Sequence, residues 1–174
     1  MASIATLMRA SRLGAAALLC GLAFAANAQP AQAADKDVLS VGLGVYDVIR
    51  DDDSAIAASL EYQSAHKLWI FDPVVGLMGT ADQSVYGYVG IAYDLKFSDH
   101  WIVTPSFAPG LYARGEGKDL GSTVEFRSAV QVAYQFDEGS RLGLLFYHMS
   151  NAGLSDHNPG TEVLMATYGL SLGK

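Results

Sequence analysis

Apolar and polar residues alternate with a period of two along most of the chain from Val38 onward. Such alternation puts successive side chains on opposite faces and is typical of β-strands with one apolar face. Gly, Asp, Asn and Pro interrupt the alternation at short intervals, as turns do. The pattern predicts eight strands: Val38–Ile49, Ala55–Ser64, Leu68–Met78, Val85–Phe97, Trp101–Ala113, Thr123–Phe136, Arg141–Asn151 and Thr161–Leu172.

Strand length favours a membrane barrel over a soluble sandwich. Each predicted strand has ten or more residues, whereas soluble strands centre on about 5–6 and a tilted membrane strand needs about 9–11. In the strand at 123–136 one face is apolar and suits lipid. The other face carries Glu125, Arg127 and Gln131, which are costly in a dry core but ordinary in a barrel lumen. We therefore predict an all-β, eight-stranded antiparallel transmembrane β-barrel.

Two further patterns bear on this barrel. Aromatic residues near the strand ends suggest the interfacial girdles of a membrane barrel: Tyr46, Tyr62, Trp69, Tyr86, Trp101, Tyr112 and Tyr134. Pro73, Pro105 and Pro109 fit poorly into paired strands, so bulges or shifted boundaries are expected there. A soluble lipocalin-like barrel with its apolar face inward is the alternative, because alternation alone does not tell inside from outside.

The N-terminus has the pattern of a secretory signal peptide, which predicts a signal at 1–28 and a barrel domain at 29–174. A basic start precedes the apolar run Leu13–Ala26, and Ala26–Ala28 is a small-x-small cleavage site. A second such site lies at Ala31–Ala33. An N-terminal anchor is the alternative, but the apolar run is short against the about 20 residues of a spanning helix.

Composition then excludes several functions. The single cysteine, Cys20, lies in the predicted signal, so a mature chain has no thiol chemistry, disulfide or cysteine-ligated zinc. The net charge is −7, and loss of the two signal arginines would make it −9, which argues against a nucleic-acid partner. A barrel of eight strands is filled by side chains, so a pore is not expected.

Titratable chemistry is concentrated in HMSNAGLSDHNPGTE, residues 148–162, between the last two strands. His148, Ser150 and Glu162 share the parity of the apolar residues in their strands, which puts all three on the apolar face. A hairpin loop centred on Ser155 would place His148 opposite Glu162, with Cβ atoms about 4.5–5.5 Å apart.

Ser150 would follow His148 at roughly 6.5–7 Å along the strand, at about 3.3–3.4 Å per residue. An imidazole between a hydroxyl and a carboxylate can activate a nucleophile. The alternative is that these are ordinary polar residues at headgroup level. No metal site is predicted, because no further ligand has a recognisable spacing to His148 and His157.

The segment FYHMSNAGL followed by NPGTE resembles the signature of the PagL family, the outer-membrane lipid A 3-O-deacylases. The matching residues are His148, Ser150, Asn151, Ala152, Gly153, Asn158 and Glu162. The resemblance implies a bacterial outer-membrane barrel that hydrolyses the ester-linked acyl chain at position 3 of lipid A. Ser150 would be the nucleophile, His148 the general base and then acid, and Glu162 the orienting carboxylate.

The resemblance also implies substrate or oxyanion contacts from Asn151, Ala152, Gly153 and Asn158. It implies no metal or organic cofactor. Its partners would be lipid A (as lipopolysaccharide) and outer-membrane lipids, with a homodimer left open. The alternative functions are a non-catalytic eight-stranded outer-membrane barrel, either adhesin or structural protein, and a soluble periplasmic ligand binder. Short predicted loops argue against an adhesin.

Overall fold

The computed structural model describes residues 29–30, 36–50 and 53–173 of the chain. The predicted signal peptide, residues 1–28, lies outside the described residues and stays a prediction. A two-residue strand, β1 (Gln29–Pro30), belongs to an N-terminal unit, and the barrel belongs to the unit that follows, Ala31–Lys174. Within the described ranges, no helix is long and apolar enough to cross a membrane.

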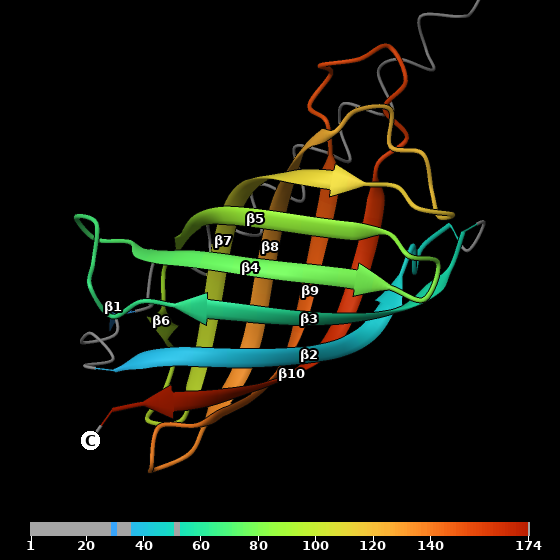
Figure 1. Cartoon of the computed structure of the whole chain (residues 1–174). Helices are drawn as coiled ribbons and strands as arrows, with labels where there is room; N and C mark the ends of the chain where they lie inside the picture. The colour runs from blue at the N-terminus through green and yellow to red at the C-terminus, as the bar shows by residue number, and fades with distance from the viewer. Residues whose placement is uncertain (1–28, 31–35, 51–52, 174) are drawn as a thin grey trace, which may run out of the picture. The chain divides into compact units, whose positions relative to one another are not determined.

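The described part of the second unit is a closed antiparallel barrel (Figure 1). Its strands are β2 (Asp37–Tyr46), β3 (Ala55–Gln63), β4 (Asp72–Thr80), β5 (Val85–Ala92), β6 (Leu95–Lys96), β7 (Trp101–Ala113), β8 (Val124–Gln135), β9 (Arg141–Ser150) and β10 (Thr161–Leu172). The short β6 continues β5 along the same partner, β7, so the wall has eight strands. Pairing of β2 with β10 and of β7 with β8 closes the cylinder. The predicted eight-stranded antiparallel barrel is confirmed.

Proline explains where the strands depart from the prediction. β4 begins at Asp72 rather than Leu68, immediately before Pro73. The pairing of β5 with β7 has a gap beside Pro109, between the pairs Tyr88–Gly110 and Ile91–Phe107, and it stops at Ala92–Ser106, next to Pro105. Tyr93 donates its N–H to the carbonyl of Pro105 at 3.0 Å, and Pro105 has no N–H to return. In an antiparallel strand both polar groups of a residue point to the same neighbour. The gap therefore faces β5, and pairing with β8 runs unbroken from Trp101 to Leu111.

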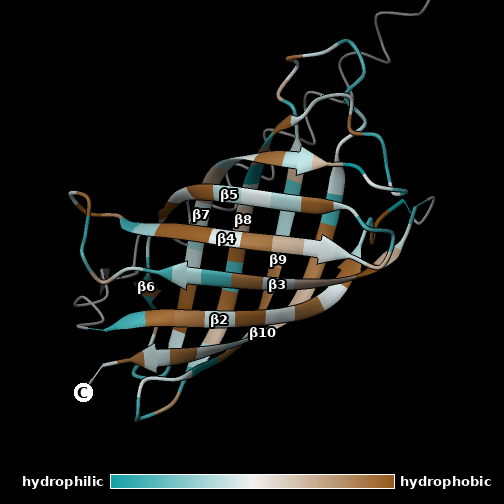
Figure 2. Ribbon diagram, in the orientation of Figure 1, coloured by the Kyte–Doolittle hydropathy of each residue, from teal (hydrophilic) through white to brown (hydrophobic). Residues whose placement is uncertain are grey.

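Apolar side chains cover the outside of the barrel, so the soluble alternative with an inward apolar face is wrong. Hydrophobic residues recur along the wall strands, and polar residues gather in the connecting loops (Figure 2). Exposed apolar side chains occur on strands all around the wall, among them Val41, Leu43, Ile56, Leu60, Leu77, Val89, Phe107, Leu111, Val132, Leu144 and Leu170. Their alternation with buried residues is that of a lipid-facing wall.

The lumen is filled by a polar and aromatic core centred on Arg127. This side chain is buried, and its guanidinium lies 3.0 Å from the Glu61 carboxylate. It also lies over the rings of Tyr88 and Tyr147, at 4.7 and 4.9 Å from their centroids. Glu125 is buried on the same face of β8. The predicted polar interior of this strand is confirmed.

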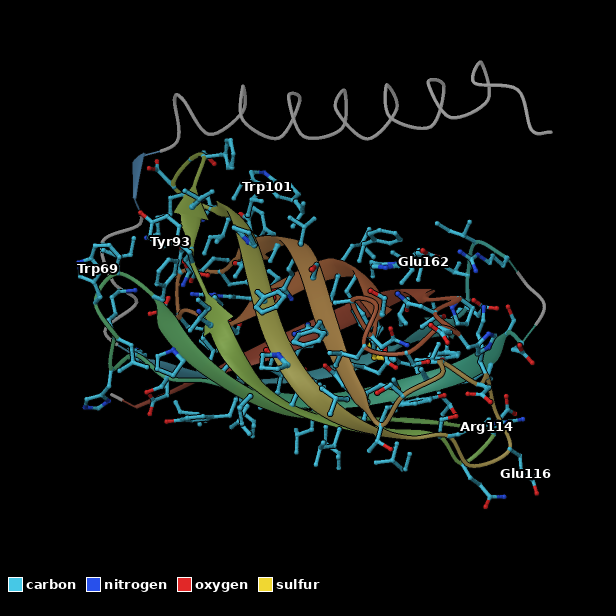
Figure 3. All side chains as sticks on the ribbon, turned by 90° about the horizontal axis from the view of Figure 1, so that it is seen from above. Trp69, Tyr93, Trp101, Arg114, Glu116 and Glu162 are labelled. Carbon is cyan, nitrogen blue, oxygen red and sulfur yellow. The ribbon has the colours of Figure 1, made fainter. Side chains whose placement is uncertain are left out.

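Three of the tyrosines predicted for an interfacial girdle instead point into the lumen. Tyr46, Tyr86 and Tyr112 are buried there, and the hydroxyls of Tyr46 and Tyr112 lie 3.1 Å apart. A polar lumen accepts tyrosines because it offers partners for their hydroxyls. Trp69 and Trp101 are exposed as expected, at 86% and 50%. Figure 3 shows both tryptophans at one end of the barrel and Glu162, Arg114 and Glu116 at the other.

We expect Arg127→Leu to destabilise the barrel by about 3 kcal/mol, because removing one partner leaves the other charge unpaired in the lumen. The free energy of unfolding would be measured by denaturant titration of the refolded barrel in detergent. Arg114→Leu is the control, since its ion pair with Asp119 is 57% exposed on both sides and such pairs contribute at most about 1 kcal/mol. Equal losses in the two variants would contradict a central role for Arg127.

Candidate active site

The hairpin formed by β9 and β10 brings His148 and Glu162 together. The two residues are directly paired across the strands, and His148 Nδ1 lies 2.9 Å from Glu162 Oε1. The expected register, with a loop centred on Ser155, is therefore confirmed. A carboxylate only accepts hydrogen bonds, so Nδ1 carries a proton, and in the neutral imidazole Nε2 then has the free lone pair. That tautomer is the one a general base needs.

Both residues lie on the outward face of the barrel. The His148 side chain is 45% exposed and that of Glu162 is 15% exposed. Their neighbours along the strands, Tyr147, Met149 and Val163, are buried in the lumen core. His148 and Glu162 thus alternate with lumen residues along β9 and β10, while their role on this face stays a prediction.

Two serines flank the imidazole on the same face. Ser150 lies two residues further along β9, and Ser128 of β8 is paired directly opposite His148. Among the described residues, the hydrogen bond on the imidazole ring is the one to Glu162. The sheet therefore places two serines beside His148, neither of them hydrogen-bonded to the imidazole among the described residues, and the sequence pattern pointed to Ser150 alone.

Asn151 directly follows β9 and anchors the loop of residues 151–160. Its side chain is fully buried, and its Nδ2 donates to the carbonyls of Leu120 and His157, both at 2.9 Å. Its Oδ1 accepts from the N–H of Gly153 at 2.9 Å. Asn151, for which a substrate contact was predicted, thus links this loop by hydrogen bonds to the β7–β8 connection, residues 114–123.

The remaining motif residues shape the start of this loop. Ala152 and Gly153 have φ values of +54° and +82°, the left-handed region that favours glycine. Asn158 accepts the N–H of Asn151 with its Oδ1 at 3.1 Å, so its amide NH₂ remains a donor. The N–H of Gly153 is engaged by Asn151, whereas the described hydrogen bonds give the N–H of Ala152 no acceptor.

Gly160 is a site residue to which the sequence assigned no role. A Cβ on Gly160 would lie 2.8 Å from Cε1 and 3.4 Å from Nε2 of His148, and its φ is +63°. The backbone of Gly160 therefore packs against the imidazole edge, where a side chain would displace the ring. Its place in NPGTE, two residues before Glu162, was the available signal.

A buried ion pair lies next to the hairpin on its lumen side. Lys118 Nζ lies 2.6 Å from Asp47 Oδ1, and Thr161 donates to the same oxygen at 3.0 Å. Burial acts to raise the pKa of Asp47, and the hydrogen bonds from Lys118 and Thr161 outweigh it, so the pKa lies below its usual value. Asp47 is therefore an anion at neutral pH. Nothing in the local sequence signalled this pair, because its partners come from separate loops.

The fold is shared with transmembrane barrels of known structure. The crystal structure of the outer membrane enzyme PagL superposes with a TM-score of 0.64 at 16% identity, covering 78% of this chain and 99% of that chain. A structure from the de novo design of transmembrane β-barrels superposes with a TM-score of 0.57 at 11% identity, covering 79% and 95%. Both likenesses agree with the predicted transmembrane-type barrel.

Sequence comparison identifies the family. The lipid A deacylase PagL of Bordetella bronchiseptica is 33% identical over 51 residues, which are 29% of this chain and 29% of that protein. The profile described as lipid A 3-O-deacylase (PagL) matches residues 49–171, more than half of the chain and the whole candidate site. On this match the chain belongs to the PagL family.

Proposed function

We propose that this protein is a lipid A 3-O-deacylase of the bacterial outer membrane, with Ser150, His148 and Glu162 as its triad. The observation that carries the proposal is the imidazole–carboxylate pair, 2.9 Å apart, on an outer wall of apolar residues. A hydroxyl lies on the same face two residues away. Family membership supports the reaction and the substrate class.

The chemistry follows from the tautomer of His148. Nε2 takes the proton of Ser150 as Oγ attacks the ester carbonyl carbon, and Glu162 stabilises the resulting imidazolium. The tetrahedral intermediate collapses as the C–O bond breaks, and the imidazolium gives its proton to the departing sugar oxygen. Water then repeats the sequence on the acyl-serine, which releases a fatty acid and regenerates the hydroxyl.

Two donors are available for the oxyanion. The N–H of Ala152 and the side-chain amide of Asn158 are the groups near Ser150 with donor capacity left. Gly153 has open space where a side chain would stand, and we assign it the role of keeping the approach to Ala152 clear. Asn151, with its three hydrogen bonds inside the protein, acts as a positioning residue of this loop.

The wall beside the triad suits an acyl chain. The next outward pair along the hairpin is Phe146 with Leu164, followed by Leu144 with Ala166. Phe146, Leu164 and Leu144 are 39–59% exposed. A lipid in the same leaflet could thus present its ester to Ser150 while its chain stays against the barrel.

The competing function is a non-catalytic barrel, adhesive or structural. Such a protein has no need of a carboxylate that is largely buried on the outer face beside a histidine, since removing a charge from water is costly unless it is paired. One oxygen of Glu162 is in addition buried without a partner in the described part of the chain. A buried carboxylate that lowers stability in this way is typical of a site that serves function.

Ser150→Ala should abolish deacylation, because no hydroxyl would remain at the assigned nucleophile position. Lipid A from cells expressing the variant would keep the hydroxyacyl group that wild type removes, as measured by mass spectrometry. Ser128→Ala is the matched control: it removes the other outward serine beside His148 and should keep the activity. If Ser150→Ala were active and Ser128→Ala inactive, the nucleophile would be Ser128 and not Ser150.

Gly160→Ala should lower kcat about 100-fold, since displacing a reacting group by about 1 Å can cost that much. The added methyl would press on His148 without altering any group of the triad. Gly87→Ala, where the nearest atom is at an ordinary 3.7 Å, should leave kcat unchanged. Both barrels would be checked for heat-modifiable migration on gels, and full activity of a folded Gly160→Ala barrel would refute the contact.

A further inference from the structure

The backbone of Glu162 and the side chain of its neighbour Thr161 are both bonded to the residues that directly follow β2. The N–H of Val48 donates to the carbonyl of Glu162 at 3.0 Å. The preceding residue, Asp47, accepts the hydroxyl of Thr161 at 3.0 Å. Thr161 and Asp47 are both fully buried. The first two residues of β10 are therefore fixed from the lumen side, while the Glu162 side chain points outward.

Asp47 also accepts the N–H of Asp53 at 3.3 Å, and its charged partner comes from the β7–β8 loop. Lys118 is 7% exposed and lies 2.6 Å from the carboxylate. Its own carbonyl accepts the hydroxyl of Tyr112 at 2.9 Å, which fixes the loop to the wall. Two residues later, the carbonyl of Leu120 accepts from Asn151. One loop thus reaches both the end of β9 and the start of β10.

The opposite end of the barrel has the same three kinds of group without a catalytic neighbour. Thr104 donates to Asp94 at 2.7 Å, and Arg141 lies 2.8 Å from the same carboxylate. All three residues are buried. Arg141 is the first residue of β9, whose other end carries the candidate site. The chain therefore contains an internal comparison for the cluster at the catalytic end.

We propose that Thr161, Asp47 and Lys118 form a brace that positions Glu162, and through it His148, for the reaction. This inference rests on the proposed function. The imidazole is 45% exposed, and on that side it meets lipid or solvent, which cannot hold a side chain in one orientation. The precise placement of the pair must therefore be imposed through the backbone from inside the barrel. The three are positioning residues, since none reaches the outer face.

Thr161→Val tests the brace, because valine keeps the shape of threonine and removes its hydrogen bond. We expect kcat to fall about tenfold or more with KM within about twofold, since misplaced groups slow the chemical step more than binding. Thr104→Val removes the equivalent bond at the opposite end and should keep wild-type kcat. Both variants should lose similar heat resistance, and Thr161→Ser, which restores the hydroxyl, should recover most of the activity.

If Thr161→Val does not fold, two double variants at Asp47 and Lys118 test the brace instead. Asp47→Asn with Lys118→Met removes both charges and keeps an oxygen that accepts from Thr161. Asp47→Leu with Lys118→Met also removes both charges and offers no acceptor. The brace predicts at least about fivefold higher kcat in the first double variant, since a misplaced catalytic pair slows the reaction, and equal values would overturn it.

The outcomes separate the two proposals. Ser150→Ala is assayed in the same series, and if it retains deacylase activity the assignment of Ser150 is wrong, while the brace, which acts on Glu162 and His148, still stands or falls with Thr161→Val. If Ser150→Ala is inactive while folded Thr161→Val keeps wild-type kcat, the brace alone is wrong. An equal loss of kcat in Thr104→Val would also overturn it, since that result assigns the effect to general lumen stability.

Discussion

Backbone pairing between β9 and β10 is the interaction on which the candidate site depends. In the observed register His148 stands opposite Glu162, on the same face as the exposed Leu144, Phe146 and Leu164. Because side chains alternate with a period of two, a slip of either strand by one residue would turn its catalytic candidate, His148 or Glu162, into the lumen and separate the pair. The loop that sets this register is itself fixed by buried Asn151. Protein hydrogen bonds, and not the substrate, thus define the geometry of the site.

The filled lumen determines which surface can hold a substrate. Arg127, Tyr46, Tyr86 and several methionines are among the largest fully buried side chains, and they occupy the space that a wider barrel would leave open. A lipid cannot enter such an interior. The lumen acts instead as a scaffold that contains buried ion pairs, such as that of Arg127 with Glu61. The proposed reaction is therefore assigned to the outer wall and its adjoining loops.

Features that depend on local periodicity could be predicted from the sequence, and features that depend on barrel closure could not. The number of strands and the His148–Glu162 pair follow from alternation and one short loop. The contact of Lys118 with Asp47 joins residues 71 positions apart, from loops that become neighbours only in the closed barrel. The inward tyrosines were predictable: Tyr46 has the parity of Gly42 and Gly44, whose alternate neighbours are the outward apolar residues of β2. The girdle expectation considered strand ends and neglected that parity.

The height of the site along the barrel fits the bond that the proposed reaction would break. Glu162 is the second residue of β10, and His148 is the third from the end of β9. The pair therefore lies where the apolar wall gives way to the polar loops. In a lipid the acyl ester also lies at this boundary, between hydrocarbon and headgroup. A triad placed two outward pairs further from the loops, at Leu144 and Ala166, would bury a carboxylate in hydrocarbon at a much higher free-energy cost. A triad placed in the loop would leave the acyl chain of the substrate without an apolar surface to lie against. The position next to the loops satisfies both demands, and it is also the position that a brace from inside the barrel can reach.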